Sequence, residues 1–115
     1  MSTHKYLFVY RIPCAEEPRA APSPEEIQAM FAKWNAWKAK FAQNIADPGD
    51  GIKRTGRTLH GGVVTDGPYV ESREIIGGYS VIRASSYDEA LTVARECPIA
   101  FVPGGRIEIR ELGVI

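Results

Sequence analysis

Two short stretches carry the residue pattern that begins a helix, and together they limit what this chain can fold into. The first, Ser-Pro-Glu-Glu at residues 23–26, joins a capping serine to a proline at the first helical position and a glutamate that completes a capping box. The second, Ser-Tyr-Asp-Glu at residues 86–89, is another capping box. We expect the first helix to end near Ala46, before an Asp-Pro-Gly sequence, and the second at Pro98. The first helix then carries one apolar stripe: Ile27, Met30, Phe31, Trp34, Trp37, Phe41 and Ile45.

Several segments around these helices have the composition of strands. Residues 5–11 are largely apolar on both alternating faces, so we expect a central strand that is covered on both sides. Residues 57–60 and 63–65 flank a Gly-Gly pair and predict a short hairpin. Residues 79–83 predict a further strand, and residues 106–110 alternate cleanly, as an edge strand with one exposed face does.

The order of these elements predicts an α+β fold. It is the βαββαβ order of a ferredoxin-like sandwich, with an extra short hairpin, and 115 residues suit a single domain over positions 1–115. Both helices should lie on one face of the sheet, which leaves the other face bare although the first strand is apolar there as well. We therefore expect a homodimer that packs sheet face to sheet face.

The overall composition argues against several classes of function. Lys plus Arg and Asp plus Glu both number 14, so the chain lacks the basic excess of a nucleic-acid-binding protein. No stretch approaches the roughly 20 apolar residues of a membrane span, and the amino-terminal residues lack the apolar run of a signal peptide. The two histidines and two cysteines have no metal-ligand spacing, and none of the Gly-Gly pairs fits a phosphate-binding loop. We expect a cytoplasmic protein with reduced thiols and without a metal or cofactor.

Residues 64–90, VTDGPYVESREIIGGYSVIRASSYDEA, resemble the DGPF branch of the YCII-related family. The matching motifs are Asp66-Gly67-Pro68-Tyr69, with Tyr in place of the usual Phe, then Gly77-Gly78-Tyr79 and Asp88-Glu89-Ala90. The segments KYLFVYR, SPEEIQAMFAKWNAW and ECPIAFVPGGRIEIREL fit the same pattern, so the resemblance covers nearly the whole chain. It implies a dimeric α/β-barrel fold, in agreement with the element order and the bare sheet face.

The same resemblance implies less about chemistry. Some YCII-like proteins carry a His in the first helix and an Asp just before the Pro that ends the second helix, a pair proposed to act as acid and base. In this chain the first helix has no His, and Cys97 stands before Pro98, so the pair is absent. DGPF members are often encoded beside extracytoplasmic-function sigma factors, which implies a signalling or regulatory context.

Asp66 and His60 are the candidate catalytic residues. Asp66 ends a strand, where its carboxylate could simply accept backbone N–H bonds and fix the turn, or, if buried, could act as a general base or ligand anchor. His60 lies beside the Gly-Gly turn and is either an exposed turn residue or a proton shuttle. The two residues lie near opposite ends of the predicted hairpin.

Five further residues are candidates for ligand binding. Tyr10, Tyr69 and Tyr79 could either pack at the rim of the core or offer a hydroxyl to a cleft. Trp34 belongs to the apolar stripe and is either core or the lining of an apolar pocket. Arg11 closes the first strand and could pair with Asp66 or hold an anionic ligand.

These candidates support three hypotheses about function. The first is a sensor or accessory module that binds a small molecule between sheet and helices. The second is a cofactor-free acid–base enzyme, of isomerase or lyase type, with Asp66 as base and His60 or a tyrosine as its partner. The third is a protein-interaction module for a sigma factor. Burial of Asp66 within reach of a second titratable group is the geometric condition that the enzyme hypothesis has to meet.

Overall fold

The computed structural model describes residues 3–13, 22–67 and 74–115. Its elements follow in this order: β1 (His4–Pro13), α1 (Pro24–Lys40), β2 (Ile45–Asp47), β3 (Arg57–His60), β4 (Val63–Asp66), β5 (Glu74–Ala84), α2 (Tyr87–Arg95), the 3-10 helix η1 (Pro98–Phe101) and β6 (Arg106–Glu111). Strands β2, β5, β1 and β6 hydrogen-bond in that order into one sheet, and β3 pairs with β4 separately. All of these pairings are antiparallel.

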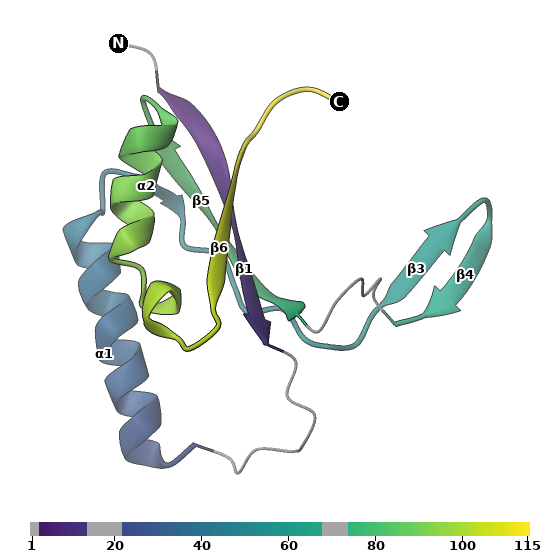
Figure 1. Cartoon of the computed structure of the whole chain (residues 1–115), viewed down its shortest axis with the longest axis horizontal. Helices are drawn as coiled ribbons and strands as arrows, with labels where there is room; N and C mark the ends of the chain where they lie inside the picture. The colour runs from purple at the N-terminus through teal and green to yellow at the C-terminus, as the bar shows by residue number, and fades with distance from the viewer. Residues whose placement is uncertain (1–2, 14–21, 68–73) are drawn as a thin grey trace.

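The main sheet confirms the predicted α+β, ferredoxin-like fold. Elements β1, α1, β2, β5, α2 and β6 make up the βαββαβ motif, and the β3–β4 hairpin is inserted between the second and third strands of that motif. Figure 1 shows both helices on the same side of the sheet. Strand β6 lies at the edge, as its alternating sequence predicted.

The predicted end of the first helix was wrong, and a strand was missed there. Helix α1 ends at Lys40 rather than near Ala46, because the chain turns at Phe41, whose carbonyl accepts hydrogen bonds from the N–H groups of Asn44 and Ile45. Ile45 then pairs with Ile82 of β5 and begins β2. Phe41 and Ile45 keep the helical spacing because both pack against the core, one from a turn and the other from a strand. Spacing alone could not distinguish these cases.

Both predicted capping boxes form. The Ser23 hydroxyl accepts a hydrogen bond from the N–H of Glu26 at 3.2 Å, and the Ser86 hydroxyl accepts one from the N–H of Glu89 at 3.2 Å. The Glu89 carboxylate also accepts hydrogen bonds from the N–H of Ser85 and the amide of Asn44, which ties the start of α2 to the turn before β2. These hydrogen bonds, led by those from Ser85, lower the pKa of Glu89.

The core lies between the helices and one face of the sheet. Side chains alternate along β1 as predicted: Tyr6, Phe8 and Tyr10 are buried under the helices, whereas Leu7 and Val9 are half-buried on the opposite face. The other buried apolar residues contribute to the same core: Trp37, Ile82, Ala84, Ala90, Val93, Ala94 and Cys97.

Only the second half of α1 covers the sheet. Trp37 is buried and its indole N–H donates to the carbonyl of Val93 at 2.9 Å, which joins the two helices. The first half of α1 extends past the sheet (Figure 1), and the predicted apolar stripe is uncovered there: Phe31 is 63% exposed, and Ile27 and Met30 are also exposed. The apolar stripe predicted from the sequence is therefore uncovered over its first two turns.

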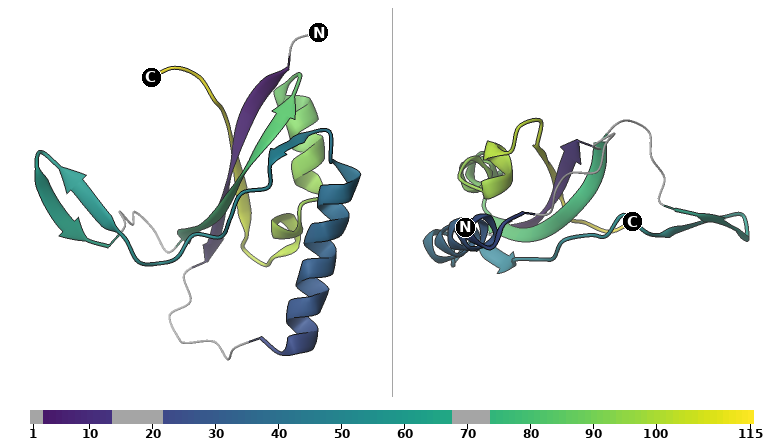
Figure 2. Two further views of the ribbon diagram at one scale, coloured as in Figure 1. Left: turned by 180° about the vertical axis from the view of Figure 1, so that it is seen from behind. Right: turned by 90° about the horizontal axis from the view of Figure 1, so that it is seen from below.

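The face of the sheet opposite the helices is apolar at its centre. Leu7 and Val9 of β1 lie directly across from Val81 and Tyr79 of β5, and all four side chains are half-buried. The helices do not reach this side of the sheet, as Figures 1 and 2 show. We refer to Leu7, Val9, Tyr79 and Val81 as the bare face.

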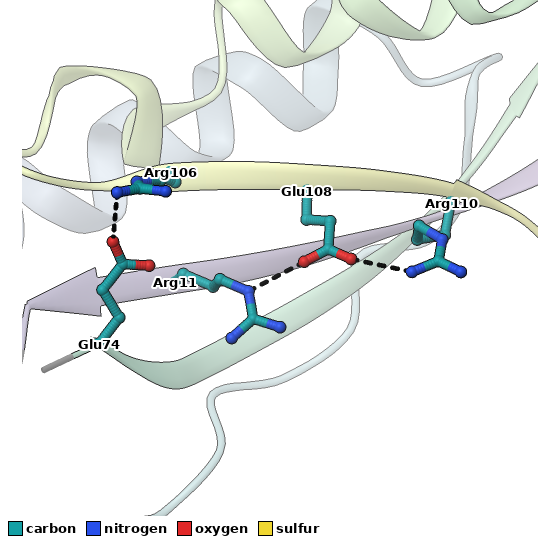
Figure 3. A network of polar contacts seen from close by, with 5 residues as sticks. All are labelled: Arg11, Glu74, Arg106, Glu108 and Arg110. Atoms are coloured by element: carbon teal, nitrogen blue, oxygen red, sulfur yellow. Dashed lines mark hydrogen bonds and ion pairs between the residues drawn. The ribbon is translucent and has the colours of Figure 1, made fainter. Parts of the chain in front are cut away.

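A polar network borders the bare face along β6 (Figure 3). Glu108 accepts a hydrogen bond from Nε of Arg11 at 2.9 Å and pairs with Arg110 at 3.1 Å, and Arg106 pairs with Glu74 at 2.8 Å. The hydrogen bond from Arg11, and then that from Arg110, lower the pKa of Glu108. This border is half-exposed or exposed, so each ion pair contributes modestly to stability.

The β3–β4 hairpin stands apart from the sheet, on the side away from the helices (Figures 1 and 2). The predicted Gly-Gly turn forms, with φ of 56° at Gly61 and 80° at Gly62, in the left-handed region that the tight hairpin turn requires. We call this hairpin, Arg57–Asp66, the arm. No helix of the described ranges is both long enough and apolar enough to cross a bilayer.

Candidate functional site

The predicted site residues lie in three separate places. Tyr10 and Trp34 are on the helix-covered side of the sheet, Arg11 and Tyr79 are on the opposite side, and Asp66 and His60 are on the arm. Tyr69, the remaining candidate, lies outside the described residues. The single chain therefore does not bring these residues together into one site.

Asp66 and His60 occupy opposite ends of the arm. Asp66 pairs with Arg57 at the open end of the hairpin and His60 pairs with Val63 next to the turn. The Asp66 side chain is 95% exposed and forms an ion pair with Nε of Arg57 at 3.3 Å. In the single chain this carboxylate thus lies in solvent, without the burial that the enzyme hypothesis requires.

Arg11 has a partner of its own. Its guanidinium donates to Glu108 across the β1–β6 pairing, so of the two roles left open by the sequence, pairing with Asp66 is not the one seen in the single chain. Tyr79 packs with Val9 on the bare face, and the chain gives it no role on the helix-covered side.

Tyr10 is the centre of a buried polar chain. Its hydroxyl donates to the Ser80 hydroxyl at 2.6 Å, and Ser80 in turn donates to the carbonyl of Pro48 at 2.6 Å. Tyr10 is almost completely buried and Ser80 completely so. Burial raises the pKa of Tyr10 far above its ordinary value, so this hydroxyl stays protonated throughout the physiological range. The chain therefore holds a neutral hydroxyl in an otherwise apolar layer.

Cys97 completes this arrangement from the end of α2. Its side chain is fully buried and belongs to the same core as Tyr10. Burial raises the pKa of Cys97, so the thiol is neutral and a poor nucleophile. Cys97 precedes Pro98, the position at which the resemblance places the Asp of an acid–base pair. In this chain a buried, protonated thiol stands at that position.

Two tryptophans cover the same spot from α1. The ring centroids of Tyr10 and Trp34 lie 5.7 Å apart, and those of Trp34 and Trp37 lie 5.6 Å apart in an edge-to-face arrangement. Trp37 is buried, whereas Trp34 is half-buried and continues into the exposed stripe on the first half of α1. We refer to the set as the Tyr10 cluster: Tyr10, Trp34, Trp37, Ser80 and Cys97.

Sequence reasoning missed Ser80 and Cys97, although a signal for Ser80 was present. Strand β5 alternates, and Ser80 falls on the same face as Ile82 and Ala84, so it is a polar residue at a position where the core requires burial. Such a residue needs a partner, and Tyr10 of the neighbouring strand supplies it. Cys97 could be placed beside Tyr10 only once the packing of α2 on the sheet was known.

The Gly77-Gly78 pair of β5 leaves room for the backbone that follows β2, next to the Tyr10 cluster. Gly78 lies opposite Tyr10, and a Cβ atom there would come within 3.0 Å of the carbonyl oxygen of Asp50 and 3.4 Å of the Tyr10 ring. The backbone that follows β2 can therefore lie against β5, with Ile52 donating to Gly77 at 2.9 Å. This contact also brings the Pro48 carbonyl to Ser80.

The Tyr10 cluster contains no charged side chain. Its two titratable side chains, Tyr10 and Cys97, are both held neutral by burial. Across the described ranges, no three His, Cys, Asp or Glu side chains lie close enough together to hold a metal ion. The cluster combines aromatic rings and two buried hydroxyls, and it adjoins the exposed apolar stripe of α1.

Comparison with known families identifies the chain. The family model of the YCII-related domain matches residues 9–113. The chain belongs to the YCII-related family. The match includes both helices and all of the sheet except the first half of β1, so it agrees with the βαββαβ order seen in the structure. A search of the curated proteins found no significant match for this YCII-related chain.

Proposed function

We propose that this YCII-related protein binds a small aromatic or otherwise apolar molecule at the Tyr10 cluster and acts as a cytoplasmic sensor or accessory module. One observation carries the proposal. Trp34 is half-buried, with its ring against Tyr10 on the inner side and the exposed residues Ile27, Met30 and Phe31 continuing from it along α1. An apolar helix face that begins in the core and continues uncovered is a surface that a ligand would stabilise.

The size and chemistry of this surface favour an aromatic ligand. Phe31 is four residues after Ile27 and three before Trp34, so these side chains share one face of α1. Phe101 of η1, which is 71% exposed, adds a further ring from the element that contacts α1. Aromatic pairs contribute about 0.5–1.5 kcal/mol beyond the burial of their area, so a flat ring among these side chains would bind by stacking and desolvation.

Binding is favoured over acid–base catalysis for a chemical reason. A general base has to ionise near the working pH, and the raised pKa values of Tyr10 and Cys97 keep both groups protonated there. Asp66, the base of the alternative hypothesis, is in solvent on the arm of the single chain. The enzyme hypothesis would require a second molecule to bury that carboxylate beside a proton donor.

The setting that we propose is a homodimer with a regulatory role. Two copies would pack their bare faces together, which would cover the apolar centre formed by Leu7, Val9, Tyr79 and Val81. The resemblance to DGPF proteins extends this to a signalling context beside an extracytoplasmic-function sigma factor. A ligand that rigidifies α1 in such a dimer would supply the signal.

Tryptophan fluorescence provides the test, because the chain has only Trp34 and Trp37. The protein is titrated with a panel of aromatic probes: indole, benzoate, catechol, anthranilate and 4-hydroxyphenylacetate. We expect at least one probe to change the emission saturably, and we expect Trp34→Phe to abolish that change while Trp37→Phe retains it. Phe31→Ser should raise the Kd about fivefold to tenfold, a loss of about 1–1.4 kcal/mol.

A matched control separates local from general effects. Leu59→Ser replaces an equally exposed apolar residue on the arm and should leave the Kd unchanged. Saturable binding that is insensitive to both Trp34→Phe and Phe31→Ser would place the ligand elsewhere. A full panel without any change in emission or in Tm would refute an aromatic ligand.

A further inference from the structure

The arm is poorly covered by the rest of the described chain. Every side chain of β3 and β4 except Thr58 is exposed, including three apolar ones: Leu59 at 70%, Val63 at 63% and Val64 at 61%. A two-stranded hairpin is at best marginally stable alone in water and usually packs against another element. Within the described residues the strands of the arm pair only with each other, so its exposed apolar side chains are a candidate contact surface for another molecule.

The register of the hairpin sorts its side chains into two faces. Leu59 lies directly opposite Val64, and Arg57 lies opposite Asp66, so these four residues share one face. That face has an apolar centre, and its ion pair between Arg57 and Asp66 neutralises the charge at one end. Such a face is suited to an apolar partner surface rather than to a strongly charged one.

The radius of gyration and the accessible surface of the chain both exceed those of a compact monomer of the same size. The radius of gyration is 15.8 Å, whereas a compact domain of this length has about 13 Å. The accessible surface is 8686 Å², about 2,400 Å² more than the roughly 6,200 Å² expected of a folded monomer of 12.7 kDa. A standard interface buries about 800 Å² on each partner, so the excess is large enough for one.

The direction of the arm identifies the partner as a second copy. All three views show the arm on the side of the sheet away from the helices, which is the side of the bare face (Figures 1 and 2). A molecule seated on the bare face therefore lies beside the arm as well. In a two-fold dimer both copies supply the same surfaces, so each bare face is covered and each arm has a surface to pack on. Equal numbers of acidic and basic residues remove net repulsion between the copies.

We propose that the β3–β4 arm packs on a second copy of this chain through its Leu59–Val64 face. The interface would be isologous, with the two arms exchanged, and it extends the proposed bare-face dimer. Asp66 shares the Leu59–Val64 face, so the arm would place this carboxylate on the surface of the partner subunit. Any chemistry or ligand contact of Asp66 would then belong to the dimer and not to the chain that carries it.

Sedimentation velocity over about 1–100 µM protein tests the proposal. We expect the wild type to dimerise, and the double variant Leu59→Asp/Val64→Asp to raise the dimer Kd at least about 100-fold, since two charges would be placed in an apolar contact. Phe31→Asp is the matched control, because Phe31 has similar exposure on the helix side and should leave dimerisation unchanged. A monomeric wild type at about 100 µM, or a double variant that dimerises as the wild type does, would overturn the proposal.

Hydrogen exchange on the unmodified protein gives a second, independent readout. We expect amide protection of residues 57–66 to rise with protein concentration in step with dimerisation, while residues of α2 stay equally protected at all concentrations. Arm amides that exchange identically in monomer and dimer would contradict the arm contact even if dimers form. Leu59→Asp/Val64→Asp should leave aromatic-probe binding to the monomer intact, so failure of the arm proposal and failure of the ligand proposal can be told apart.

Discussion

The two faces of the main sheet are built from the same strands, yet one face is buried and the other is only half-buried. On β1, Tyr6, Phe8 and Tyr10 are almost completely buried by the helices, whereas the alternating residues Leu7 and Val9 are only half-buried. Both sets are apolar, so hydrophobicity alone does not decide which face is covered. The difference comes from the helices, because α1 and α2 both lie on one side of the sheet (Figure 1). A sheet that is apolar on both faces needs a second covering layer, which a partner can provide.

The largest expected effect compares neighbouring residues on the two faces. Phe8→Ala should destabilise the protein by about 3–5 kcal/mol, because Phe8 is completely buried and its removal leaves a cavity. Val9→Ala should cost about 1 kcal/mol in dilute protein, since the valine is only half-buried. Urea denaturation at about 1 µM measures both. Equal costs would remove the distinction between the faces.

An intermediate effect concerns the buried hydroxyls on the covered face. Ser80→Ala should cost about 1–3 kcal/mol, because it leaves the buried Tyr10 hydroxyl without its acceptor. Tyr10→Phe in addition should cost less than the sum of the two single changes, since it removes the unsatisfied donor. A thermodynamic cycle from denaturation midpoints measures this coupling. Strict additivity would show that the Tyr10–Ser80 hydrogen bond contributes nothing to stability.

The smallest effect is expected at the border of the bare face and depends on pH. Hydrogen bonds from Arg11 and Arg110 lower the pKa of Glu108 below its ordinary value of 4.5, so folding favours the ionised carboxylate. Its contribution is therefore complete above pH 4.5 and is lost as the pH falls through the lowered folded-state pKa. Glu108→Gln should cost less than about 1 kcal/mol at pH 7, because the pair is partly exposed.

Comparing Glu108→Gln with the wild type at low pH shows whether the loss of stability comes from the charge of Glu108. Denaturation curves of wild type and Glu108→Gln, collected between pH 7 and pH 3, should converge at the acidic end. A difference that persists unchanged at pH 3 would assign the effect to packing and not to charge.

Much of the fold could be predicted from local pattern. The capping boxes at Ser23 and Ser86, the alternation of β1 and the Gly-Gly turn of the arm all depend on residues close together in sequence, and each formed as expected. Strand β2 was missed because three residues beside a proline and a glycine carry no periodicity of their own. It exists through pairing with β5, which a sequence read in order does not show.

The candidate site was harder to predict, for a related reason. Tyr10 and Trp34 were separate candidates for ligand binding, and their contact was not predicted, nor was the hydrogen bond between Tyr10 and Ser80, which lie 70 residues apart in sequence. Asp66 was a candidate because it ends a strand, but that strand belongs to the arm and not to the main sheet. Which strand pair belongs to the sheet and which forms the arm is decided by long-range pairing.

Because Cys97 is completely buried, its chemical reactivity can measure local opening of the core. A maleimide can alkylate this sulfur only after α2 has lifted from the strands beneath it, so the alkylation rate in a Cys14→Ser background counts such openings. A ligand that binds against Trp34 would lower the alkylation rate of Cys97 without contacting its sulfur. The alkylation rate of Cys97 would thus measure how often the layer around Tyr10 opens.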